Sequence, residues 1–285
     1  MNMNLPTSLK AGGVTPCAPG LRDSAAGRGL PAAGTGRAPQ AFTLVELLVV
    51  IAIIGIVAGI SVPAFKNMQK ADAEAAATRQ LVDEVANARQ RAISSRSDVY
   101  MVFIPPAPAD PNVYFAGLTT AQERQQATNL LRGQYSSYSF YSDRSVGDQP
   151  GQFNPRYLAE WRFLPQGTFI ASNKFFAIAN SVTPFWYKPF PFPDATSPLR
   201  SLPYIGFDYQ GRVFHEDATG EKVYSEDAVI PLARGTVSSP SGASLPVTAT
   251  VEEKPPGNSI TASNHIRVDW LTGRGSVERQ QISGN

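Results

Sequence analysis

The chain has 285 residues, of which 42% are hydrophobic and 17% are charged, and its formal net charge is +2. This length accommodates one globular domain of ordinary size together with one apolar anchor. The near balance of charge gives no global electrostatic argument for a nucleic-acid or acidic partner. The single cysteine, Cys17, has no second cysteine with which to form an intrachain disulfide.

The first 41 residues have the composition of a targeting segment, not of a folded domain. They are rich in Gly, Ala and Pro, and four basic residues stand against one acidic residue: Lys10, Arg22, Arg28 and Arg37 against Asp23. Basic residues before an apolar helix keep that end of the chain in the cytoplasm. We therefore expect residues 1–41 to be a leader and the C-terminal domain to lie outside. A true start codon downstream of Met1 is an alternative explanation for the length of this leader.

The apolar run at residues 42–63 is long enough for a membrane-spanning helix, which needs about 20 residues. It contains one carboxylate, Glu46, near its start. A charged side chain inside a bilayer costs about 2.5–3.5 kcal/mol, so Glu46 requires either a partner or a place at the headgroup interface. Gly55 and Gly59 form a pair of small residues that permits another helix to approach closely. The run predicts a transmembrane and assembly helix.

The helical pattern continues past Pro63 through residues 64–96. This part is rich in Ala, and Leu81, Val85, Ala88 and Ala92 recur at helical spacing to form one narrow apolar stripe. A helix from residue 42 to residue 94 would be about 80 Å long. Proline lacks a backbone donor, so a kink or a local loss of helix is predicted at Pro63. The second half of the helix should pack against the globular domain.

Residues 97–285 predict a β-rich head, because short β-branched and aromatic runs alternate with turn residues. The expected strands lie at residues 98–104, 134–141, 161–164, 168–170, 204–208, 213–214, 228–232, 244–252, 265–270 and 275–279. A short polar helix is expected at residues 121–131, and the prolines of residues 183–193 predict a loop. The fold class is therefore α+β, with a long N-terminal helical spine packed on an antiparallel β-rich head.

The sequence FTLVELLVVIAIIGI, which begins at Phe42, resembles the N-terminus of type IV pilins and type II secretion pseudopilins. Counted from Phe42, Glu46 is fifth and Pro63 is twenty-second, where the family has its Glu and its Pro. The resemblance implies that a prepilin peptidase cleaves between Ala41 and Phe42 and methylates the new amine of Phe42. The family usually has Gly before the cleavage site, where this chain has Ala41.

The resemblance also implies a structural role, not an enzymatic one. Glu46 would pair with the Phe42 amine of a neighbouring subunit, which cancels two buried charges. The implied partners are the prepilin peptidase and N-methyltransferase, other pilins or pseudopilins in a helical filament, the inner membrane and its assembly platform. The N-terminus would be cytoplasmic and the head periplasmic until the subunit enters a type II secretion pseudopilus or a type IV pilus-like filament. Removal of the leader would also remove Cys17.

Four short segments are similar to the secretion-protein-H and FimT-type minor pseudopilins, which have a pilin-like fold. These segments are residues 88–94, 163–168, 206–212 and 272–274. The FimT-like resemblance leaves DNA binding for uptake as an alternative function, with Arg267, Arg274 and Arg279 as the candidate residues. The resemblance implies a Gly-Arg-x-Arg pattern at the last turn of DNA-binding members. This chain has Gly273-Arg274-Gly275-Ser276 there and lacks the second Arg. Asp269 and Glu278 also dilute the positive charge that phosphate binding requires. Nucleic acid is therefore not the expected partner.

The Pro- and aromatic-rich stretch around Phe185–Phe192 leaves a further alternative, in which a filament-tip module recognises a secreted partner. The competing interpretation, which we favour, is that these aromatic side chains complete the core of the head.

No arrangement of residues predicts catalysis, and no cofactor is expected. His215 and His265 are too few to form a recognisable metal cluster and are expected in a strand or a turn. Asp208, Glu216 and Asp217 are rich in carboxylate oxygen and leave calcium as an option, but their spacing matches no defined calcium loop.

Overall fold

The computed structural model describes residues 42–106, 112–144, 148, 152, 154–176, 183–239, 248–261 and 264–279, without the side chains of residues 60–72, 261 and 279. The expected leader, residues 1–41, lies outside the described residues. The chain divides into two compact units, residues 1–53 and residues 54–285. The described helices are α1 (Leu44–Ser95), α2 (Asn112–Phe115), α3 (Ala121–Leu131), the 3-10 helix η1 (Ser172–Lys174) and α4 (Asn258–Thr261).

The strands belong to the second unit. They are β1 (Val99–Phe103), β2 (Ser137–Ser142), β3 (Arg156–Tyr157), β4 (Arg162–Phe163), β5 (Thr168–Ile170), β6 (Trp186–Pro191), β7 (Leu199–Phe207), β8 (Val213–Glu216), β9 (Lys222–Val223), β10 (Ala228–Ser238), β11 (Thr250–Glu253), β12 (Asn264–Val268) and β13 (Gly275–Arg279). The α+β class predicted from the sequence is confirmed, because every strand pairing in the described part of the chain is antiparallel.

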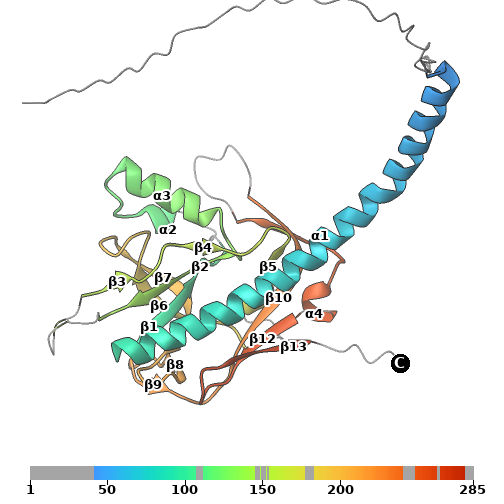
Figure 1. The fold of residues 1–285 in the computed structure, drawn as a ribbon. Helices are drawn as coiled ribbons and strands as arrows, with labels where there is room; N and C mark the ends of the chain where they lie inside the picture. Colours follow the sequence, from blue (N-terminus) through green and yellow to red (C-terminus); the bar gives the residue numbers. More distant parts are fainter. Residues whose placement is uncertain are drawn as a thin grey trace, which may run out of the picture. The chain divides into compact units, whose positions relative to one another are not determined.

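Helix α1 ends at Ser95, close to the end predicted from its apolar spacing. The helical assignment runs without a break across Pro63, so the local loss of helix expected there is not found. Four residues of the predicted stripe, Leu81, Val85, Ala88 and Ala92, have no exposed surface. They share one core with residues of both sheets, and Figure 1 shows this part of α1 lying along the strands. The two alanines leave room for the sheets to approach the helix backbone closely.

The larger sheet has eight strands among the described residues, in the order β3-β2-β1-β7-β8-β9, with β4 beside β2 and β6 beside β7. Its central strand β1 is buried on both faces, since successive side chains point to opposite sides of a strand. Val99, Met101 and Phe103 join the core beneath α1. Tyr100 and Val102 join a second core, which α2 and α3 cover on the other face.

The smaller sheet has five strands among the described residues, in the order β11-β10-β12-β13, with β5 also beside β10. The predicted strand, turn and strand at residues 161–170 form β4 and β5, but these strands do not pair with each other. Strand β4 pairs with β2 in the larger sheet, and β5 pairs with β10 in the smaller one. The turn at Pro165 and Gly167 therefore carries the chain from one sheet to the other.

The Pro- and aromatic-rich stretch is not the loop that the sequence predicted. Residues Trp186–Pro191 form strand β6, which pairs with β7 over its full length. Strand β6 has only β7 as its partner among the described residues, so it is an edge strand. A proline cannot donate a ladder hydrogen bond, but on an edge strand its nitrogen can face away from the partner. The prediction was wrong because the prolines exclude only a central strand.

A side chain replaces a strand at one position on the edge of β10. Strand β12 pairs with β10 as far as Leu232, and β11 pairs with it from Gly235 onward. Asn258, which is 1% exposed, fills the gap between them. Its Oδ1 accepts from the backbone nitrogen of Arg234 at 2.8 Å, and its Nδ2 donates to the Arg234 carbonyl oxygen at 2.7 Å. The amide thus makes the two hydrogen bonds that a strand backbone would make.

We expect Asn258→Ala to lower the free energy of unfolding by about 2 kcal/mol, because the backbone nitrogen of Arg234 loses its acceptor, whereas the Arg234 carbonyl oxygen keeps its hydrogen bond from the Lys254 backbone nitrogen. The measurement is urea unfolding followed by circular dichroism. Asn129→Ala is the matched control, since Asn129 is exposed on α3 and should cost less than about 0.5 kcal/mol. Equal losses in the two variants would show that the Asn258 amide contributes nothing special.

Candidate processing and assembly site

The start of α1 is held by a reciprocal pair of residues, Thr43 and Glu46. One carboxylate oxygen of Glu46 accepts from the backbone nitrogen of Thr43 and from its hydroxyl, both at 2.9 Å. The Thr43 hydroxyl oxygen accepts in turn from the backbone nitrogen of Glu46 at 3.2 Å. This is a capping box, which satisfies backbone donors that the first turn of a helix leaves unpaired. Phe42 precedes the pair and is 82% exposed.

Sequence reasoning singled out Glu46 but missed Thr43. The signal was present, since a Thr three residues before a Glu at the start of an apolar run is the sequence pattern of a capping box. The carboxylate of Glu46 is therefore occupied within its own helix in the single chain. Pairing with an amine from another chain would have to compete with these hydrogen bonds or share the carboxylate with them.

The first turns of α1 carry a continuous apolar surface that nothing in the described chain covers. Ten or more large apolar side chains of residues 44–57 are about half exposed or more, among them Leu44, Ile51 and Ile56. Exposed apolar surface of this extent marks a site of contact with a membrane or another protein. A methyl group added at Gly55 or Gly59 would meet no atom within 4 Å, so both positions are open to a close neighbour.

The structure describes the other two residues predicted for this site only in part or not at all. Ala41 lies outside the described residues, and Pro63 is described only by its place in the backbone of α1. None of the helices in the described ranges combines the length and the apolarity needed to cross a bilayer.

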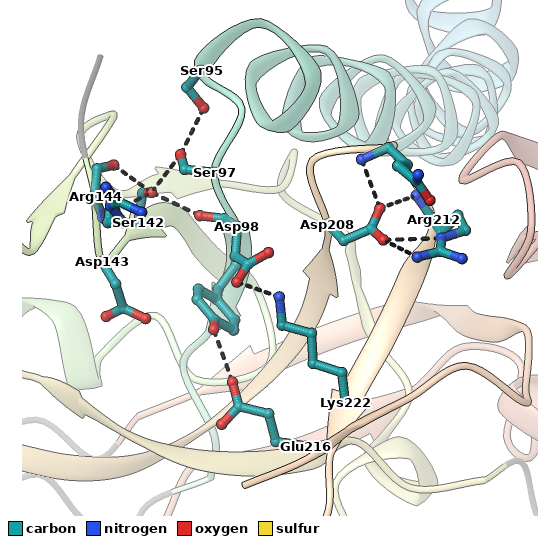
Figure 2. A network of polar contacts seen from close by, with 12 residues as sticks. Ser95, Ser97, Asp98, Ser142, Asp143, Arg144, Asp208, Arg212, Glu216 and Lys222 are labelled. Carbon is teal, nitrogen blue, oxygen red and sulfur yellow. Dashed lines mark hydrogen bonds and ion pairs between the residues drawn. The ribbon is translucent and has the colours of Figure 1, made fainter. Parts of the chain in front are cut away.

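The three carboxylates considered for calcium do not converge on a common centre. Asp208 is fully buried and is bound by Arg212, whose Nε and NH2 groups donate to Oδ2 at 2.9 and 2.8 Å. Figure 2 shows Asp208 turned toward Arg212. Glu216 accepts instead from the Tyr100 hydroxyl and from Lys188. In the described ranges, no group of three or more His, Cys, Asp or Glu side chains could hold a metal ion.

Asp217, the third of these carboxylates, caps a turn of its own. Its Oδ1 accepts from the backbone nitrogens of Thr219 and Glu221 at 2.8 and 2.9 Å. These hydrogen bonds favour the ionised carboxylate and lower the pKa of Asp217, with the Thr219 hydroxyl making the largest contribution. Asp208, Glu216 and Asp217, which are close in the sequence, thus make separate contacts in the structure.

Of the three arginines considered for DNA, Arg267 is held by two carboxylates. Arg267 lies on β12, where its Nε donates to Asp227 at 2.7 Å and its NH1 donates to Glu278 at 3.1 Å. Those contacts raise the pKa of Arg267 and also neutralise its charge. Arg274 is exposed in the turn before β13. The backbone of Arg279 pairs with Asn264 at the far end of β13, and its side chain lies outside the description.

Both histidines lie in strands, as the sequence predicted. His215 of β8 is stacked on Trp186 of β6, with ring centroids 3.9 Å apart and planes 3° apart. His265 lies in β12. Burial lowers the pKa of each imidazole, because it disfavours the charged form.

The comparison with protein families identifies the N-terminal segment. Residues 36–62 match the family model of the prokaryotic N-terminal methylation motif. The match contains the expected cleavage position together with Phe42, Glu46 and the open glycines. The chain therefore carries the prepilin-type cleavage and methylation motif, which supports a subunit of the type IV pilin and pseudopilin family. That family is structural. No curated protein and no solved structure matches the chain.

Proposed function

We propose that this chain is a structural minor pseudopilin. A prepilin peptidase cleaves it between Ala41 and Phe42 and methylates the Phe42 amine, and the subunit then assembles into a type II secretion pseudopilus or a type IV pilus-like filament. The observation that carries the proposal is the match of residues 36–62 to the methylation motif. The exposed apolar surface of residues 44–57 supports it, because such a surface requires another molecule to cover it.

The proposed organisation follows the motif. Residues 1–41 are a leader, residues 42–63 anchor the subunit in the inner membrane, residues 64–96 continue the helix, and residues 97–285 form the head. The N-terminus is cytoplasmic and the head periplasmic before assembly. The assembly platform of the inner membrane then passes the subunit to a filament of other pilins or pseudopilins.

Within this family we propose the secretion-protein-H and FimT-like subgroup, with a pilin-like fold. The support is the pairing of β12 with β13 across the turn at residues 269–274, where the sequence patterns of that subgroup lie. We do not extend the proposal to DNA, because Arg267 is already neutralised by Asp227 and Glu278. Recognition of a secreted partner by the Pro- and aromatic-rich stretch is also not favoured. Phe190 and Phe192 have no exposed surface and serve the core, although Trp186 and Tyr187 of the same stretch are each 43% exposed.

We expect Glu46→Ala to reduce incorporation into filaments by about a hundredfold or more. Removing one partner of a buried ion pair costs about 3–5 kcal/mol, because the other charge stays buried without a counter-charge. In Glu46→Ala the unpaired charge would be the Phe42 amine. The measurement is an immunoblot of the sheared filament fraction against the cell fraction. Mass spectrometry of the N-terminus should still find methylated Phe42, which separates failed assembly from failed processing.

Thr43→Ala is the matched control. It removes the two capping hydrogen bonds that the Thr43 hydroxyl makes and keeps the Glu46 carboxylate, so it should still assemble. Failure of both variants would assign Glu46 to helix capping alone. Normal incorporation of Glu46→Ala, or a mature N-terminus other than Phe42, would overturn the proposed function.

A further inference from the structure

A pocket on the head is walled by two aromatic side chains and rimmed by two carboxylates. It is open to solvent, has a volume of about 520 Å³ and is lined by Gln126 of α3, the segment from Tyr157 to Trp161, and Pro193 with Asp194. These lining residues come from three separate parts of the chain. The carboxylates are Glu160 and Asp194, which are both exposed. None of the described residues that line the pocket is basic.

The donor groups of the aromatic walls are already used inside the protein. The indole nitrogen of Trp161 donates to the carbonyl oxygen of Pro193 at 3.4 Å. The hydroxyl of Tyr157 donates to the carbonyl oxygen of Pro191 at 2.6 Å. Tyr157 and Trp161 therefore present ring surface to the pocket, and the carboxylates present acceptors. Apart from the Gln126 amide, the described walls supply no side-chain donor for an anion, so a donor-rich cation is the complementary ligand.

The backbone of the pocket is rigidly placed. The carbonyl oxygen of Leu158 accepts from Arg91 of α1 at 3.0 Å, and that of Ala159 accepts from Ser139 of β2 at 2.8 Å. The rings of Tyr157 and Trp161 pack against each other with centroids 5.4 Å apart. The edge of Phe192 supports Trp161 from the core. A site held in this way loses little conformational freedom when a ligand binds.

The same head repeatedly places a cation of its own where an aromatic ring and a carboxylate meet. The instances are Lys188 over Tyr100 with Glu216, Arg212 over Tyr224 with Asp208, and Lys222 over Phe214 with Asp98. The pocket at Trp161 has the ring and two carboxylates, yet no described basic side chain of the chain pairs with Glu160 or Asp194. A cation from another molecule would complete the same arrangement here.

We propose that this pocket binds an arginine side chain of a partner polypeptide. A guanidinium is planar, so it stacks on an indole, and its fork of N–H donors matches carboxylate oxygens. A lysine ammonium would meet the same carboxylates but would lack the planar stacking surface. The site lies on the head, and its occupant would select which partner the head contacts.

The test uses the full-length protein in mild detergent and N-acetyl-arginine amide as the probe, titrated to about 50 mM because single-residue contacts bind in the millimolar range. The neutral isostere N-acetyl-citrulline amide is the ligand control, and N-acetyl-lysine amide is the second arm. Binding is measured by tryptophan fluorescence and by calorimetry. The arginine probe should bind at least about fivefold more tightly than the lysine probe, and the citrulline probe should not bind.

The pocket variant is Glu160→Gln with Asp194→Asn, which keeps the shape and removes both charges. It should weaken binding of the arginine probe by about tenfold or more. The matched control is Asp83→Asn with Glu221→Gln, which removes two exposed charges elsewhere and should change the affinity by less than about twofold. Absence of binding to the wild type, equal binding of arginine and citrulline, or unchanged binding in the pocket variant would each overturn the proposal.

Discussion

Asp208→Ala is expected to lower the free energy of unfolding by about 3 kcal/mol, the lower end of the cost of breaking a buried ion pair. Asp208 has no exposed surface and accepts four hydrogen bonds, two from backbone nitrogens and two from the Arg212 guanidinium. The Arg212 side chain is 31% exposed, so water compensates part of the loss. Urea unfolding of the wild type and the variant measures the difference.

Asp217→Ala is the matched control for this prediction. Asp217 caps a turn in a similar way, with backbone donors from Thr219 and Glu221, but it is exposed and has no arginine partner. Its loss should cost only about 1 kcal/mol. A loss in Asp208→Ala no larger than that of the control would refute the assigned role of the buried ion pair.

The Asp208 turn matters because it joins the two sheets beneath the end of α1. The backbone nitrogen of Val213 donates to the carbonyl oxygen of Trp270 at 2.8 Å. Gly211 and Gly273 meet where the two turns pack, and a Cβ at Gly273 would lie 2.0 Å from the Gly211 carbonyl oxygen. Both glycines have positive φ, at 81° and 61°. The Asp208–Arg212 ion pair thus stabilises the turn at the point where the two sheets meet. A side chain at Gly273 would clash with the backbone of this turn.

Lys174 is expected to make stability rise with pH above pH 8. Its side chain is buried, donates to the carbonyl oxygen of Thr183, and lies 4.9 Å from the centroid of the Phe185 ring. Burial lowers the pKa of Lys174 from 10.5 to about 8, opposed in part by the charge of Glu226. Such a change in pKa corresponds to about 3 kcal/mol.

The direction of this effect follows from proton binding. Below pH 8 the lysine is protonated in both the folded and the unfolded state, so its contribution does not change with pH. Between pH 8 and pH 10.5 the folded state has released the proton and the unfolded state retains it. The unfolded state then binds more protons, and stability rises with pH. The tyrosines whose pKa values are raised by burial act in the opposite direction as the pH approaches 10, because the unfolded state then releases phenol protons that the folded state keeps. Comparison of the wild type with a Lys174 variant removes this shared contribution.

The measurement is urea unfolding of the wild type and of Lys174→Met at several values between pH 7 and pH 10. The stability of the wild type relative to this variant should increase by about 2 kcal/mol or more over that interval. Lys254→Met replaces an exposed lysine and should keep the pH dependence of the wild type. The assignment to Lys174 fails if Lys174→Met retains the same dependence.

Much of the head could be predicted where the signal is local. The hairpins β7–β8 and β12–β13 were found because turn residues separate alternating apolar runs, and helix α3 was placed at residues 121–131. Strand β6 was missed, since its prolines become acceptable only when one edge of the strand has no partner. The separation of β4 from β5 was missed as well, because a turn does not state which sheet each strand joins.

The sequence also predicts some of the candidate sites but not others. Phe42 lies two residues before α1 and Glu46 lies in its first turn, so both are located by their places in the sequence. The Thr43–Glu46 capping box was also readable, since both residues lie in the first turn. The pocket of Tyr157, Trp161 and Asp194 was not, because it forms only when two loops and a helix are brought together by the packing of the larger sheet.

The sequence by itself determined the N-terminal motif, the apolar surface of residues 44–57 and the buried stripe of α1, because each depends on the periodicity of a single helix. The tertiary structure alone decided which charges are satisfied. It placed Lys222 on Asp98 and Arg267 on Asp227, and it left Glu160 and Asp194 beside an aromatic wall. Side-chain electrostatics depends on distances between residues remote in the chain, and only packing sets those distances.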